Sequence, residues 1–181
     1  MQLRETSETD LADILHLHCL AFGRNGGDEV AGLVEAILSD PSAAPRLSIL
    51  ATEAGQAVGH ILFSTARLVE DSDSAKLALL SPLAVVPDAQ NQGIGGKLIE
   101  RGLQQLKEAG TDLVFVLGHP GYYRRHGFEP AGKLGFEAPF PIPDKDADAW
   151  MIKALRPGLI GSLRGKIVCC EALDAPEYWR E

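Results

Sequence analysis

Apolar residues recur at intervals of three and four along three stretches of the chain, which predicts amphipathic helices. The first stretch covers residues 11–22. The second follows Asp28, which can cap a helix, and stops before Pro41. The third starts in the glycines at 93–95 and ends at Gly110. We therefore expect three helices, the last of which begins directly after a glycine-rich loop.

Runs of apolar and β-branched residues between and after these helices predict strands. They cover residues 46–52, 58–69, 76–86, 113–117, 149–155 and 166–170. The run at 113–117 is apolar throughout, which predicts a strand buried on both faces. Pro82 cannot donate a ladder hydrogen bond, so it predicts a bulge or break. The order of elements predicts an α+β fold with a mixed, mostly antiparallel sheet flanked by helices, in one domain over residues 1–181.

Charge and cysteine content narrow the possible partners. The formal net charge of −8 disfavours a nucleic-acid phosphate backbone and favours cationic ligands such as amines. Cys19, Cys169 and Cys170 have no metal-binding spacing, so we expect reduced thiols and no metal. No apolar run approaches the ~20 residues that span a bilayer, and the N-terminus lacks the pattern of a signal peptide. We expect a soluble, cytoplasmic protein without membrane partners.

The loop that leads into the third helix is the most informative segment. A strand ends before it and an amphipathic helix follows it, and unpaired amides at a helix N-terminus bind anions. The residues at 90–98 (QNQGIGGKL) do not fit a Rossmann GxGxxG pattern, because Leu98 occupies the third glycine position. They do not fit a Walker A loop either, because Leu98 also replaces its Ser or Thr and Asn91 replaces its first glycine.

Residues 90–95 (QNQGIG) do match the pattern Gln/Arg-x-x-Gly-x-Gly/Ala, and with it the chain resembles the GNAT acetyltransferases. The resemblance implies acetyl-CoA as cosubstrate, with its pyrophosphate bound by main-chain amides of this loop. The residues it assigns to the cofactor here are Gln90, Gln92, Gly93, Ile94, Gly95, Gly96 and Lys97. A glycine-rich turn that only packs a helix on a sheet is the alternative.

A second segment supports the resemblance. A short Tyr- and Arg-rich helix is predicted at 122–126, and Tyr123 lies four residues before the Gly127-Phe128 pair, as in many GNAT enzymes. The resemblance makes Tyr123 the general acid that protonates the leaving thiolate, since a phenol is protonated at neutral pH. Tyr122 takes this role if the helix is rotated. His119 stands where relatives often carry an Asn that binds pantetheine.

The resemblance also explains Pro82, because GNAT enzymes bulge the strand before the phosphate loop. Main-chain groups of Leu83, Ala84 and Val85 would then face the pantetheine and the thioester, with the Val85 N–H as oxyanion donor. Arg124 and Arg125 either meet cofactor phosphates or flank a helix end.

The reaction implied is direct attack by an amine in a ternary complex. Candidate general bases are Glu29, His60, Glu70 and Asp71. The acceptor, a small amine, a peptide N-terminus or a lysine, would contact residues 22–38, 69–75 and 137–155. A homodimer is compatible with this pattern. A non-catalytic acyl-CoA sensor and a small interaction protein with a structural glycine loop remain alternatives.

Overall fold

The computed structural model of the protein describes residues 1–71 and 73–180. Nine strands in this part of the chain form one sheet, and most neighbouring strands are antiparallel. The strands are β1 (Gln2–Glu5), β2 (Leu47–Glu53), β3 (Gln56–Leu68), β4 (Leu77–Val85), β5 (Leu113–Leu117), β6 (Glu129–Pro130), β7 (Phe136–Glu137), β8 (Trp150–Ala154) and β9 (Gly165–Val168). The path runs β1-β2-β3-β4-β5-β8-β6, and β9 joins the end of β3 to β7. The predicted mixed, mostly antiparallel sheet is confirmed.

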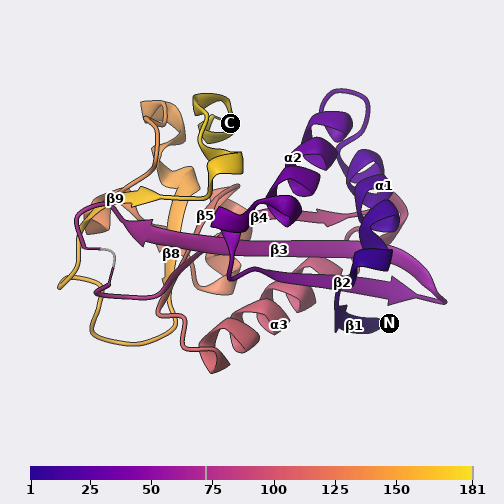
Figure 1. Ribbon diagram of the computed structural model, residues 1–181, viewed down its shortest axis with the longest axis horizontal. Helices are drawn as coiled ribbons and strands as arrows, with labels where there is room; N and C mark the ends of the chain where they lie inside the picture. The colour runs from indigo at the N-terminus through magenta and orange to yellow at the C-terminus, as the bar shows by residue number, and fades with distance from the viewer. Residues whose placement is uncertain (72, 181) are drawn as a thin grey trace.

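Helices cover both faces of this sheet (Figure 1). Helices α1 (Leu11–Phe22) and α2 (Gly27–Ser39) lie on one face, and α3 (Ile94–Glu108) lies on the other. The side chains of β5 alternate between the two resulting cores: Leu113 and Phe115 join the α1/α2 core, whereas Val114 and Val116 join the α3 core. Because both of its faces are covered, β5 is apolar throughout, as predicted.

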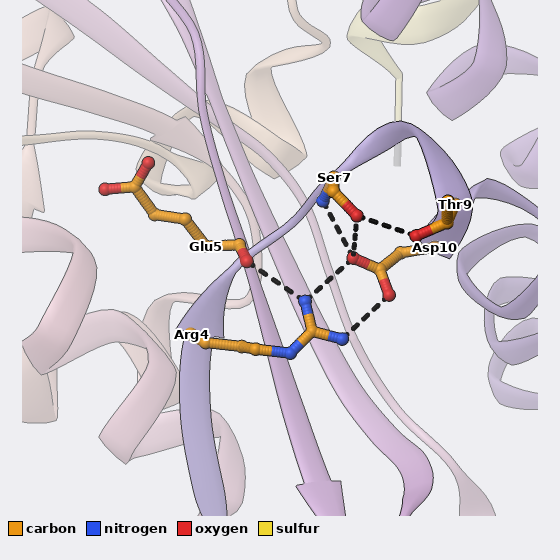
Figure 2. A network of polar contacts seen from close by, with 5 residues as sticks. All are labelled: Arg4, Glu5, Ser7, Thr9 and Asp10. Atoms are coloured by element: carbon orange, nitrogen blue, oxygen red, sulfur yellow. Dashed lines mark hydrogen bonds and ion pairs between the residues drawn. The ribbon is translucent and has the colours of Figure 1, made fainter.

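Strand β1 was not predicted, because its residues are mostly polar. It is held by antiparallel pairing to β2 and by polar contacts that fix the turn into α1 (Figure 2). Both terminal nitrogens of Arg4 donate to the Asp10 carboxylate at 2.8 Å, and the Ser7 N–H donates to the same group at 2.7 Å. These hydrogen bonds hold the pKa of Asp10 well below its usual range.

Helix α2 starts two residues earlier than predicted, with Gly26 at its cap and Asp28 inside its first turn. A Cβ on Gly27 would lie 2.6 Å from the Cys19 carbonyl oxygen of α1. The close approach of the two helices therefore sets this start, rather than the capping preference of Asp28.

Strands β4 and β5 are paired in parallel along only part of their length. Their pairing runs from Leu77 opposite Leu113 to Leu80 opposite Val116, and β4 continues to Val85 beyond the last pair. The register of β3 against β4 shifts at the same point, so that Pro82 lies in the predicted bulge. The sheet thus splits between the end of β4 and the end of β5.

The contact between α3 and the sheet provides a test of the packing. A Cβ on Gly102 would overlap the ring of Phe63, which is buried. We expect Gly102→Ala to lower the free energy of unfolding by roughly 1–3 kcal/mol through overpacking. Gly32→Ala is the matched control, because Gly32 is an exposed position of α2 with no atom near its Cβ, and it should raise stability by up to about 1 kcal/mol. Equal urea midpoints for the two variants would contradict this packing.

Candidate functional site

The predicted phosphate loop lies in a groove of about 530 Å³ at the start of α3. Asn91 and Gly93 both have positive φ, 62° and 80°, and these values turn the chain into the helix. The Lys97 N–H donates to the Gly93 carbonyl at 3.1 Å, which is the first bond of the helix. The amides before Lys97 in this turn therefore have no helical acceptor, and they carry the positive end of the helix dipole. This is an anion-binding geometry.

The opposite wall of the groove comes from the short helix α4 (Pro120–Tyr123) and the turn η4 (Arg124–His126). Tyr122, Arg125 and His126 line it. A Cβ on Gly95 would overlap the Tyr122 hydroxyl, and one on Gly96 would lie 3.1 Å from the His126 ring. Only glycine therefore lets the loop and this wall approach so closely.

Tyr122 and Arg125 were named from the sequence, whereas His126 was missed and could have been found by its spacing. Residues 122, 125 and 126 share one face of a helical turn, at separations of three and four. The Arg125 guanidinium lies 5.1 Å from the Tyr122 ring centroid. Burial raises the pKa of Tyr122 above its ordinary value, and Arg125 opposes this rise. The Tyr122 hydroxyl is therefore protonated at neutral pH and can donate a hydrogen bond.

The end of β4 supplies main-chain donors on a third side. The Val86 N–H donates to the Val58 carbonyl at 3.0 Å. From this residue back along β4, residues that hydrogen-bond to β3 alternate with residues that do not. In an antiparallel ladder every second residue directs its N–H and C=O away from the partner. This alternation directs Leu83 and Val85 toward the split, whereas Ala84 faces His60 of β3.

Tyr123 stands on the β5 side of the split. It is 8% exposed, and its ring lies against Gly118, the residue directly after β5, and against Phe128. A Cβ on Gly118 would overlap this ring. Tyr122 and Tyr123 thus point to different places: the first to the phosphate loop, the second to the end of β5.

The structure brings together about half of the predicted cofactor residues. Those lining the groove are Val85, Gln90, Gly93, Ile94, Gly95 and Gly96. Those outside its lining are Leu83, Ala84, Gln92, Lys97, His119 and Tyr123. The two glutamine side chains brace the loop: Gln90 donates to the Val85 carbonyl at 3.0 Å and Gln92 to the Asp88 carbonyl at 3.2 Å.

The candidate bases lie in two environments. Glu29, Glu70 and Asp71 are exposed. His60 is fully buried, with its Nδ1 2.8 Å from His18 Nε2 and its Nε2 2.8 Å from the Ser48 hydroxyl. Burial lowers the pKa of His18 to about 4, and burial together with His18 lowers that of His60 to about 3. Both imidazoles are therefore neutral at physiological pH.

This histidine pair should make the protein sensitive to acid. The unfolded chain takes up protons near pH 6.5, whereas the folded pair takes them up only near pH 4 and below. The contribution of the pair to the free energy of unfolding is therefore fully present above pH 6.5. It falls as pH drops through this window, by up to about 1.4 kcal/mol per pH unit for each histidine. Thermal melts from pH 7.5 to 4.5 would measure the slope.

His18→Leu should flatten that slope, while His16→Gln, at an exposed position of the same helix, should leave it unchanged. A His18→Leu slope as steep as that of wild type would contradict the assignment.

The described residues give little support for metal binding, thiol catalysis or a membrane span. Among residues 1–71 and 73–180, no group of three or more His, Cys, Asp or Glu side chains could hold a metal ion. Burial and the neighbouring Cys170 raise the pKa of Cys169, so this thiol is a poor nucleophile. Within the same residues, no helix combines the length and apolar character needed to cross a bilayer.

A sheet that splits after the last β4–β5 pair, beside a helix N-terminus of anion-binding geometry, is suited to hold a phosphorylated cosubstrate. Residues 2–131 match the family model of the acetyltransferase (GNAT) domain. The chain belongs to the GNAT family.

The relatives agree with this assignment. The chain is 44% identical to the uncharacterized N-acetyltransferase YjhQ of Escherichia coli K12, over 92% of this chain and 90% of YjhQ. The crystal structure of YhbS from Escherichia coli with CoA superposes with a TM-score of 0.84 at 26% identity, covering 96% of this chain and 92% of YhbS. A GNAT acetyltransferase from Brucella melitensis in complex with acetyl-CoA gives 0.75 at 30% identity, covering 96% and 97%. The protein is an acetyl-CoA-dependent acetyltransferase.

Proposed function

We propose that the protein transfers the acetyl group of acetyl-CoA to a primary amine by direct attack in a ternary complex. The observation that carries this proposal is the split between β4 and β5. One wall carries the main-chain groups of Leu83 and Val85, the other carries Tyr123, and the phosphate groove opens beside them. A thioester held in the split would lie between a backbone donor and a phenol.

Stabilisation of the oxyanion and protonation of the sulfur each have an assigned residue. The neutral amine attacks the thioester carbonyl, and the Val85 N–H stabilises the oxyanion that develops. As the carbon–sulfur bond breaks, Tyr123 donates its proton to the sulfur, and the amine proton passes to a base or to water. The amides of Gly93–Gly96 hold the diphosphate, with Gln90, Gln92 and Lys97 supporting the loop. His119 completes the proposed pantetheine contacts, and Ala84 is left out of them because it faces His60 of β3.

An amine acceptor has independent support. The net charge of −8 favours cations, and Asp28 and Glu29 are exposed at the start of α2. Relatives are named N-acetyltransferases. Residues 22–38, 69–75 and 137–155 are the proposed acceptor contacts, of which Ser72 lies outside the described residues. We also propose that the reaction takes place in the cytoplasm, which the three free cysteines support.

A thiol-release assay with acetyl-CoA and a panel of primary amines, including amino acids, polyamines, aminoglycosides and peptides, tests this function. We expect thiol release that depends on the amine and an acetylated product by mass spectrometry. Tight acetyl-CoA binding without turnover of any amine would favour the acyl-CoA sensor instead.

A further inference from the structure

The imidazole of His126 is positioned against the phosphate loop, although His126 is not part of the loop pattern at residues 90–95. It lines the groove, and its Cε1 lies 3.1 Å from the place of a Gly96 Cβ. Its main chain is anchored, because Lys153 Nζ donates to the His126 carbonyl at 2.8 Å. The ring packs against Tyr122, with 5.2 Å between centroids. The imidazole therefore faces the first turn of α3 from the opposite wall.

The charged groups around this imidazole come from three elements. Glu100 lies on α3, Arg125 on η4 and Lys153 on β8. Partial burial of the ring lowers its pKa most. Glu100 opposes this effect, whereas Arg125 and Lys153 add to it. The free protein thus favours a neutral imidazole, which two cations influence and which lies beside a helix N-terminus that attracts anions.

We infer that His126 is a ligand of the cofactor's diphosphate and that binding of CoA is coupled to the uptake of a proton by this residue. The inference deepens the cofactor site on which the proposed function rests. A diphosphate at the amides of Gly95 and Gly96 would place negative charge beside the imidazole. That charge favours the imidazolium, which can donate a hydrogen bond to a phosphate oxygen. One proton moves from solvent to the His126 ring, and no covalent bond changes.

The two neighbouring arginines have separate roles in this arrangement. Arg124 forms an ion pair with Asp148 at 3.7 Å and does not line the groove. Arg125 lines the groove and stacks on Tyr122. The Arg125 guanidinium attracts phosphate independently of pH. His126 supplies the part of the attraction that depends on pH.

The direction in which the affinity for CoA changes with pH follows from the linkage between binding and proton uptake. Because bound phosphate raises the pKa of His126, affinity is highest at low pH and falls as pH rises from the free pKa to the bound pKa. The slope is at most about tenfold in Kd per pH unit for one proton. Above the bound pKa, the imidazole is neutral in both states and the Kd becomes constant.

Calorimetric titration of the wild-type protein with CoA tests the inference without any need for an acceptor. Titrations between pH 6 and 8.5, in pairs of buffers with different ionisation enthalpies, measure the number of protons taken up. We expect uptake that approaches one proton within the window, and a Kd that rises severalfold with pH. The same uptake is expected with dephospho-CoA, which keeps the diphosphate and lacks the 3′-phosphate.

His126→Gln is the decisive variant, because glutamine keeps an amide donor and cannot titrate. It should bind CoA more weakly at pH 6, with no uptake and a flat pH profile. Arg124→Gln is the matched control and should behave as wild type. Melting curves show whether each variant is folded.

Unchanged proton uptake in a folded His126→Gln variant would overturn the inference, as would wild-type binding without uptake. Uptake seen with CoA and lost with dephospho-CoA would overturn the assignment to the diphosphate. Wild-type protein that fails to bind CoA at all would contradict the cofactor site itself, and the inference would fail with it.

Discussion

Gly95→Glu should abolish coenzyme A binding, with a Kd at least ~100-fold higher than that of wild type. The new carboxylate would stand in the first turn of α3, where we propose that the diphosphate meets free amides. Repulsion between two unit charges about 4 Å apart near a protein surface is about 4 kcal/mol, and 1.4 kcal/mol corresponds to tenfold in Kd. The new side chain would also overlap the Tyr122 hydroxyl. Calorimetry with CoA and acetyl-CoA measures the loss.

Two further variants separate the effect of the added charge from that of the added bulk. Gly95→Ala adds bulk without charge, so its effect should be intermediate. Gly32→Glu adds the same charge at an exposed position of α2 with open space around it, and should bind like wild type. Wild-type affinity in a folded Gly95→Glu variant would show that the diphosphate binds elsewhere.

Tyr123→Phe should lower kcat by about 10²–10⁴-fold, the range that a general acid contributes. The change removes only the hydroxyl, and the ring can still pack against Gly118 and Phe128. The Kd for acetyl-CoA should therefore remain close to that of wild type. Single-turnover rates with an active amine, together with calorimetry, measure the two effects separately.

Tyr122→Phe is the matched control and should show the opposite pattern. Its hydroxyl lies against Gly95 in the groove, so its loss should weaken acetyl-CoA binding with a smaller effect on the chemical step. If Tyr122→Phe were to abolish turnover while Tyr123→Phe kept it, the acid would be Tyr122.

The sequence predicted those features that depend on neighbours along the chain. The helix at 11–22 and the strand at 113–117 were predicted at their observed bounds, because each has an unbroken pattern of apolar residues. The glycine-rich loop between β4 and α3 was also predictable, whereas its binding of a phosphate stays a prediction. An anion site at a helix N-terminus needs only a strand end, flexible glycines and free amides, and all of these are encoded within a few residues.

Other features were decided only by the tertiary structure, since they depend on residues far apart in the sequence. Strands β1, β6 and β7 are short and carry no alternating pattern, so they are defined by the strands with which they pair. The hydrogen bond between His18 and His60 requires α1 to pack over β3. The two tyrosines at 122 and 123 are adjacent in sequence, yet the packing of α4 directs one to the groove and the other to Gly118. A periodic pattern specifies which face of an element is buried, whereas contacts between distant segments specify what that face meets.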